Sequence, residues 1–188
     1  MAKYRIYMVK LGNPRVGSES NTGAALKAYF DQVIQSNAAL QHRFSDGAEV
    51  QWLTRCPGPA AHELLIYVVS SGMDSIVVSL PGLRSRPASI DADGLTVWAG
   101  SLTASEVYTT RFGSNAAMLA KLAFHETMHN KTHQGAGLHS SGGLAASPVT
   151  PSSSLTPANI RTMAGLLARS RPQWAGGCTA YNDPLRGL

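Results

Sequence analysis

The sequence contains very little cysteine. Cys56 and Cys178 are the only two cysteines among 188 residues, and this scarcity excludes a disulfide framework and a cysteine-rich zinc module. The two thiols could form one bridge in an oxidising compartment, or both could stay buried and reduced. The sequence leaves their pairing open, so a hydrophobic core must hold the fold together.

The sequence also lacks a long apolar run. No stretch approaches the roughly 20 residues of a membrane-spanning helix, and the charges of Lys3, Arg5 and Lys10 interrupt the apolar residues near the N-terminus. We therefore expect no membrane partner and no cleaved secretory signal. The expected location is the cytoplasm, or outside the cell after export without a classical signal peptide, as for a secreted effector.

Clusters of charge are absent as well. Sixteen Lys and Arg outnumber eleven Asp and Glu, which gives a net charge of +5, but the basic residues are scattered singly, so we expect no nucleic-acid partner. No phosphate-binding loop or dinucleotide fingerprint stands between a strand and a helix. Hydrophobic residues make up 44% of the chain. This composition is typical of a globular domain, and we expect a monomer.

Hydrophobic periodicity predicts an α+β fold. Apolar stretches that alternate or run continuously between Gly, Pro and polar residues are typical of strands. They lie at residues 4–11, 49–55, 63–70 and 95–110. The third should be a central strand because it is apolar throughout, and the last should form one or two strands near a sheet edge. Residues 74–80 fit either a strand or a short helix.

Three helices complete the pattern. Apolar residues at helical spacing predict an amphipathic helix over residues 24–40, capped by Asn21 or Thr22. Ser114 is the expected cap of a second helix, and Thr156 caps a third that has Pro157 at its first position. We expect a single domain over residues 1–188. Its N-terminal subdomain would span residues 1–139, and a small C-terminal subdomain with one helix would span residues 140–188.

Residues 125–129 read HETMH, which matches the H-E-x-x-H motif of zinc sites on helices. His125 and His129 are four residues apart, so their imidazoles lie one helical turn apart on one face and can reach the same ion. Glu126 lies beside them. The motif predicts a metal site with these two histidines as ligands.

The third ligand must come from further along the chain. After His139 the sequence has no glutamate and a single acidic residue, Asp183. His133 lies eight residues after His125, about 12 Å along a regular helix, too far for one zinc ion with bonds of about 2 Å. We expect His133 beside the site or in solvent unless the helix breaks early. Two glycines, at 135 and 137, are the expected helix stop that lets His139 complete the site.

Residues 125–149 resemble the metzincin metallopeptidases, the clan of matrixins and astacins. Their signature is H-E-x-x-H-x-x-G-x-x-H followed by a methionine-containing turn. GLHSS and SLTPANIRTMAGLLARS are similar to the third-histidine segment and the C-terminal helix of matrixins. Two features depart from the family: the interval from His129 to His139 is four residues longer, and the turn GGLAASPV has Leu144 and two alanines where the family has methionine. Met163 lies in the expected last helix and does not replace it.

The resemblance implies a zincin/metzincin-like fold, with a twisted mixed β-sheet, two helices and a small C-terminal subdomain. It further implies a zinc endopeptidase in which His125, His129 and His139 bind Zn²⁺. A zinc-activated water would hydrolyse a protein or peptide substrate, with Glu126 as the general base. In the family the substrate extends along the edge strand of the sheet, here expected within residues 98–108. Tyr181 is a candidate to stabilise the oxyanion, or else a packed tyrosine.

Two alternatives remain open. The stretch GCTAYND is similar to the downstream segment of aspzincins, in which an aspartate supplies the third ligand, so Asp183 would replace His139. The other alternative is a catalytically inactive protein of peptidase-like fold that binds zinc or a peptide. The missing methionine favours this second alternative, and the presence of Glu126 argues against it.

Overall fold

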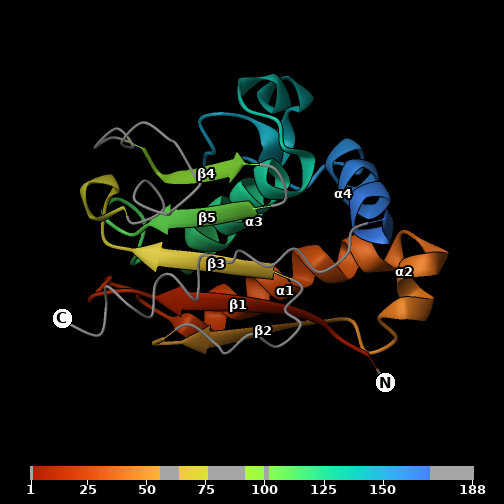
Figure 1. Cartoon of the computed structure of the whole chain (residues 1–188), viewed down its shortest axis with the longest axis horizontal. Helices are drawn as coiled ribbons and strands as arrows, with labels where there is room; N and C mark the ends of the chain where they lie inside the picture. The colour runs from red at the N-terminus through yellow and green to blue at the C-terminus, as the bar shows by residue number, and fades with distance from the viewer. Residues whose placement is uncertain (1, 56–63, 76–91, 100–101, 170–188) are drawn as a thin grey trace.

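A five-stranded mixed sheet organises the molecule (Figure 1). The computed structural model describes residues 2–55, 64–75, 92–99 and 102–169. The strands are β1 (Tyr4–Lys10), β2 (Ala48–Leu53), β3 (Leu64–Val69), β4 (Gly94–Ala99) and β5 (Leu102–Tyr108), in the order β2-β1-β3-β5-β4. All neighbouring strands are parallel except the antiparallel pair β4 and β5. The expected α+β class, the mixed sheet and the central position of β3 are confirmed.

The edge of the sheet differs from the expectation. Residues 98–108 were expected to contain the edge strand, but β5 lies between β3 and β4 and is an interior strand. The edge strand on this side of the sheet is β4, which pairs in antiparallel register with β5 alone among the described strands. The expected range therefore covers only the end of the strand that forms the edge.

The helices are α1 (Glu19–Gln35), α2 (Ala38–Arg43), α3 (Ala116–Thr132) and α4 (Pro157–Arg169). Three short 3₁₀ segments accompany them within the described ranges: η1 (Gly72–Asp74), η3 (Ala136–Ser141) and η4 (Gly143–Ala145). Helices α1 and α3 lie side by side on one face of the sheet, and α4 lies beside α2 at one end of the molecule (Figure 1). No helix in the described ranges is long and apolar enough to cross a membrane.

The first helix begins earlier than expected and ends earlier too. Ser18 is the N-cap of α1, and its hydroxyl accepts a hydrogen bond from the Asn21 amide, so the expected cap at Asn21 or Thr22 is wrong. The side chain of Asn37 accepts from the amides of Ala39 and Leu40 and starts the separate helix α2. Several polar residues here can cap a helix, and sequence alone does not show which one meets the free amides.

The same ambiguity affects the helix that carries the motif. Asn115, not Ser114, is the N-cap of α3, because its Oδ1 accepts from the Met118 amide at 3.1 Å. The expected cap of α4 is confirmed, since Thr156 Oγ1 accepts from the Asn159 amide.

A core of aromatic and aliphatic side chains joins α1 and α3 to the sheet. The ring of Phe30 lies 5.3 Å from that of Tyr4 and 5.2 Å from that of Phe124, centroid to centroid, and all three side chains are almost fully buried. Phe124 directly precedes the motif on α3. The core therefore fixes the helix against the sheet at the residue before the first histidine.

Cys56, Cys178 and residues 76–80 lie outside the described residues. The division of the domain at residue 139 stays a prediction.

Candidate metal centre

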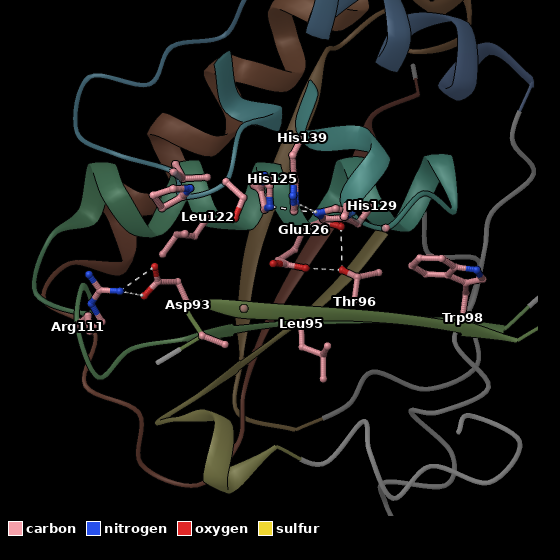
Figure 2. A pocket seen from close by; sticks show the side chains of 17 residues that line it. Asp93, Leu95, Thr96, Trp98, Arg111, Leu122, His125, Glu126, His129 and His139 are labelled. Atoms are coloured by element: carbon pink, nitrogen blue, oxygen red, sulfur yellow. Dashed lines mark hydrogen bonds and ion pairs between the residues drawn. The ribbon is translucent and has the colours of Figure 1, made fainter. Parts of the chain in front are cut away.

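The side chains of three histidines converge beside the middle of β4 (Figure 2), with one ring nitrogen of each within 4.8 Å of the others. His125 and His129 come from α3, and His139 comes from η3. Nε2 of His129 lies 3.1 Å from Nε2 of His125 and 3.1 Å from Nε2 of His139. Two nitrogens bound to one tetrahedral zinc at about 2.0–2.1 Å would be about 3.3 Å apart, so these spacings fit a shared metal ion.

Backbone carbonyls fix the tautomers of the two helical imidazoles. Nδ1 of His125 donates to the carbonyl of Leu144 at 2.8 Å, and Nδ1 of His129 donates to the carbonyl of Gln134 at 2.5 Å. A neutral imidazole that donates from Nδ1 carries a lone pair on Nε2. The two Nε2 atoms therefore face each other as acceptors, an arrangement that a cation stabilises.

Burial keeps these imidazoles neutral. It lowers the pKa of His125 to about 4, against the smaller opposing effect of the Leu144 carbonyl, and it lowers the pKa of His129 as well. A metal ligand must be deprotonated. The site therefore supplies nitrogen ligands in the required form at neutral pH.

The chain reverses direction immediately after α3. The helix ends at Thr132, and His133 adopts a left-handed conformation with φ of 52°. The expected stop at Gly135 and Gly137 is therefore wrong by two residues, because His133 takes the left-handed position that glycine usually occupies. The following turn η3 carries His139 back toward α3. This early reversal accommodates the long interval between His129 and His139.

His133 does not join the other three histidines. Its ring stacks on Trp98 of β4, with centroids 5.8 Å apart and planes 10° apart. It therefore lies beside the site, as expected if it is not a ligand, and its stacking links the end of α3 to the edge strand.

Glu126 lies deep between α3 and the edge strand. Its side chain is 5% exposed, and Oε2 accepts a hydrogen bond from the Thr96 hydroxyl at 2.6 Å. A Cβ at Gly94 would lie 2.6 Å from Oε1 of Glu126, so only glycine lets the carboxyl approach β4 this closely. Burial raises the pKa of Glu126 to about 8, opposed by the Thr96 hydrogen bond and assisted by the charges of Glu106 and Asp93.

A layer of hydroxyl and amide groups joins α3 to the sheet under the motif. Asn130 Nδ2 donates to Ser105 Oγ at 3.1 Å, and Asn130 Oδ1 accepts from Thr103 Oγ1 at 3.3 Å. Thr96 Oγ1 and Ser105 Oγ are 2.9 Å apart. Hydrogen bonds are directional, so this layer fixes the rotation of α3 about its axis and with it the direction of the histidines.

The turn after η3 depends on one residue of α4. Asn159 is fully buried; its Oδ1 accepts from the amide of Leu144 at 3.0 Å, and its Nδ2 donates to the carbonyl of Gly142 at 3.1 Å. Leu144 in turn accepts from His125, so Asn159 positions the carbonyl that orients a candidate ligand. Leu144 is buried at the position of the missing methionine, and Met163 lies on α4, as expected.

The histidines and Glu126 line an open cleft of about 380 Å³. Residues 92–96 and Trp98 form one wall, α3 forms the floor, and Gly135, Ala136, His139 and residues 147–149 close the opposite side. Figure 2 shows Trp98 at one end of the cleft, Asp93 and Arg111 at the other, and the histidines between them. A metal ion here would have room for a further ligand from solvent or substrate.

Sequence reasoning found His125, Glu126, His129 and His139, which the structure brings into one cleft. It missed the side chains whose hydrogen bonds hold these residues in place, namely Thr96, Ser105, Asn130 and Asn159. None of these stands in a recognisable motif, so the printed sequence carries no direct signal for them. Tyr181 and Asp183 lie outside the described residues, and their expected roles stay predictions.

Comparisons with known proteins identify no relative: no protein-family model, no curated protein and no solved structure matches this chain.

Proposed function

We propose that this protein is a zinc-dependent metallopeptidase of metzincin-like fold that hydrolyses protein or peptide substrates. One observation carries the proposal: three imidazole nitrogens converge in an open cleft that a buried glutamate also lines. A structural zinc site is usually closed by four protein ligands, whereas a catalytic site keeps one position for water or substrate.

The donor set favours zinc over other metals. Three neutral imidazoles suit zinc, copper, iron and nickel better than calcium or magnesium, which prefer oxygen ligands. The H-E-x-x-H spacing on a helix is the pattern associated with zinc in metallopeptidases. Zinc is therefore the ion proposed for His125, His129 and His139.

When bound, zinc would supply a Lewis acid that lowers the pKa of a water and polarises the substrate carbonyl. The chain supplies the proton transfer. Glu126 would accept the proton of the attacking water and pass it to the leaving amine. A cation beside Glu126 favours its ionised form, the form that accepts a proton, and the Thr96 hydroxyl holds the carboxyl in place.

The edge strand offers a binding mode for an extended peptide. β4 lines the cleft and pairs with β5 on one side, and no other described strand pairs with it. A peptide can add to such an edge through backbone hydrogen bonds. We propose that the substrate lies along β4, which would place its scissile bond beside the three histidines.

The decisive experiment measures zinc content and peptide hydrolysis on the same samples. We expect one zinc per chain in the wild type, loss of zinc in His139→Ala, and retained zinc without hydrolysis in Glu126→Gln. His133→Ala serves as the matched control, because His133 stacks on Trp98 outside the cluster, and it should retain zinc.

Other outcomes would redirect the proposal. Full zinc content in His139→Ala would overturn the ligand assignment, and Asp183→Ala would then test the aspzincin-type site. Stoichiometric zinc with no cleavage of any peptide in a random library would contradict the peptidase and favour a protein that binds without hydrolysis.

A further inference from the structure

A charged pair lies at the end of the cleft opposite Trp98 (Figure 2). Nη1 of Arg111 lies 3.2 Å from Oδ1 and 3.3 Å from Oδ2 of Asp93. Both residues line the same cleft as the histidines and Glu126. Neither residue contacts the histidine cluster, so the proposed zinc site gives no reason for their presence.

Neighbouring groups hold the guanidinium in place. The Asp93 carbonyl accepts from the Tyr108 amide at 3.0 Å, which ties Asp93 to the end of β5. The Cζ atom of Arg111 lies 5.0 Å from the centre of the Phe112 ring. The Asp93 side chain is only 16% exposed, whereas that of Arg111 is 55% exposed. Asp93 and Phe112 therefore position a guanidinium that still faces solvent.

Part of the guanidinium remains available to a ligand. Nη1 alone makes both contacts to Asp93, and within the described residues the Nε and Nη2 groups of Arg111 make no hydrogen bond. An arginine has five N–H donors in a planar fork that matches the two oxygens of a carboxylate. As far as the described residues go, the edge of the fork formed by Nε and Nη2 is thus free for such a contact.

We propose that Arg111 binds a carboxylate of the substrate, and that this contact selects peptides with an acidic group close to the scissile bond. The inference rests on the proposed peptidase function for its reaction. A carboxylate on the substrate can be an Asp or Glu side chain or a free C-terminus, and both offer the same pair of oxygens. The net charge of +5 would assist the approach of an anionic substrate.

The opposite preference, for a basic residue bound by Asp93, fits the pair less well. Both carboxylate oxygens of Asp93 already accept from Arg111, and the side chain is mostly buried. A lysine or arginine of the substrate would have to share these oxygens with Arg111 and would lie beside its positive charge. A carboxylate ligand meets an attractive charge instead.

The first test determines which peptides the zinc-loaded enzyme cleaves. A random peptide library, blocked at both ends, is digested, and the products are identified by mass spectrometry. We expect Asp and Glu over Asn and Gln at one position near the cleaved bond, by about tenfold or more in kcat/KM for matched peptides, the usual effect of a charge-assisted hydrogen bond. A second library with free C-termini distinguishes the sources, since a terminal carboxylate would direct cleavage to the last few residues.

Variants of Arg111 link the preference to this side chain. In Arg111→Gln the ratio between acidic and amide peptides should fall close to one, and Arg111→Lys should retain part of it because a lysine keeps the charge without the fork. Arg161→Gln removes the same charge from the exposed surface of α4 and should keep the wild-type ratio. An unchanged ratio in Arg111→Gln would overturn the inference.

A binding measurement separates this inference from the proposed function. Two peptide hydroxamates that differ only by Glu or Gln are titrated into the zinc-loaded protein by calorimetry, which requires no hydrolysis. Tighter binding of the Glu compound by about tenfold, lost in Arg111→Gln, would support the carboxylate site even if no peptide is cleaved. Equal affinities in the wild type would overturn the carboxylate site whether or not the protein is a peptidase.

Discussion

The two halves of the sheet hold their helices in different ways. Where β1, β2 and β3 meet α1, the contacts are apolar, as between Tyr4 and Phe30. Where β4 and β5 meet the second half of α3, hydroxyl and amide groups of Thr96, Ser105 and Asn130 make hydrogen bonds. Apolar burial is non-directional, so it stabilises the fold, whereas hydrogen bonds fix one orientation. The candidate site lies on the half of the sheet whose helix is held by directional hydrogen bonds.

The apolar half should control stability and leave the site intact. Phe30→Ala removes a fully buried ring from between Tyr4 and Phe124, and we expect the free energy of unfolding of the metal-free protein to fall by about 3–5 kcal/mol. Urea denaturation measures this loss. Zinc content per folded molecule should not change. A loss of zinc from a variant that remains folded would contradict the statement that the apolar half stabilises the fold without holding the site.

The turn beside the site should affect both stability and metal binding. Asn159→Ala leaves the Leu144 amide and the Gly142 carbonyl without their partner, which should cost about 2–3 kcal/mol of unfolding free energy. Because Leu144 orients His125, zinc affinity should also fall by about 10- to 100-fold, measured by competition with a chromophoric chelator. Asn159→Asp keeps the acceptor and should lie in between. Wild-type affinity in a folded Asn159→Ala protein would show that the turn does not orient the ligand.

The buried carboxyl on the polar half should make metal-free stability depend on pH. The pKa of Glu126 is about 8 in the folded protein and about 4.3 in an unfolded chain, so the folded state binds more protons and stability falls as pH rises between these values. His125, with a pKa of about 4, has the opposite effect below about pH 6.5. Between pH 6.5 and 8 the change in metal-free stability with pH should therefore come from the ionisation of Glu126.

Across that window the metal-free wild type should lose about 1–2 kcal/mol of unfolding free energy. Thermal or urea denaturation at several pH values measures the slope. Glu126→Gln, which cannot ionise, should show a nearly flat profile in the same window. Equal slopes in the two proteins would mean that the carboxyl is not held in its neutral form.

The hydroxyl that holds Glu126 should have the smallest effect on stability. Thr96→Val keeps the shape of the side chain and removes the donor to Oε2, with an expected loss of about 1 kcal/mol. Because that hydrogen bond lowers the pKa of Glu126, its removal should move the acidic limb of the kcat/KM profile to higher pH. Thr96→Ser retains the hydroxyl and should keep the wild-type profile. A profile that does not move in Thr96→Val would indicate that Thr96 does not affect the base.

Local patterns in the sequence predicted much of this arrangement. The strands, the central position of β3 and the histidine pair follow from periodicities that a short window contains. His139 followed from the reach of a helix and the need for a third ligand. The carbonyl of Leu144, the amide of Asn159 and the pair of Asp93 and Arg111 act across the fold. Their roles depend on which segments meet in space, so the sequence did not reveal them.

The helix ends were hard to predict for a related reason. Glycine is the usual residue in a left-handed conformation at a helix end, and two glycines follow α3. The structure instead places His133 in that conformation, with its ring stacked on Trp98 of the edge strand. A non-glycine residue thus occupies the position for which the sequence offered two glycines, and no local pattern signals it.

The reversal after α3 bears on how such sites should be searched for. His139 reaches the cluster because the chain turns back at His133 and re-enters through η3, so its position depends on the path of the chain and not on a count of residues. A search that demands a fixed interval after H-E-x-x-H would pass over this chain, whereas one that allows a variable interval would retrieve it.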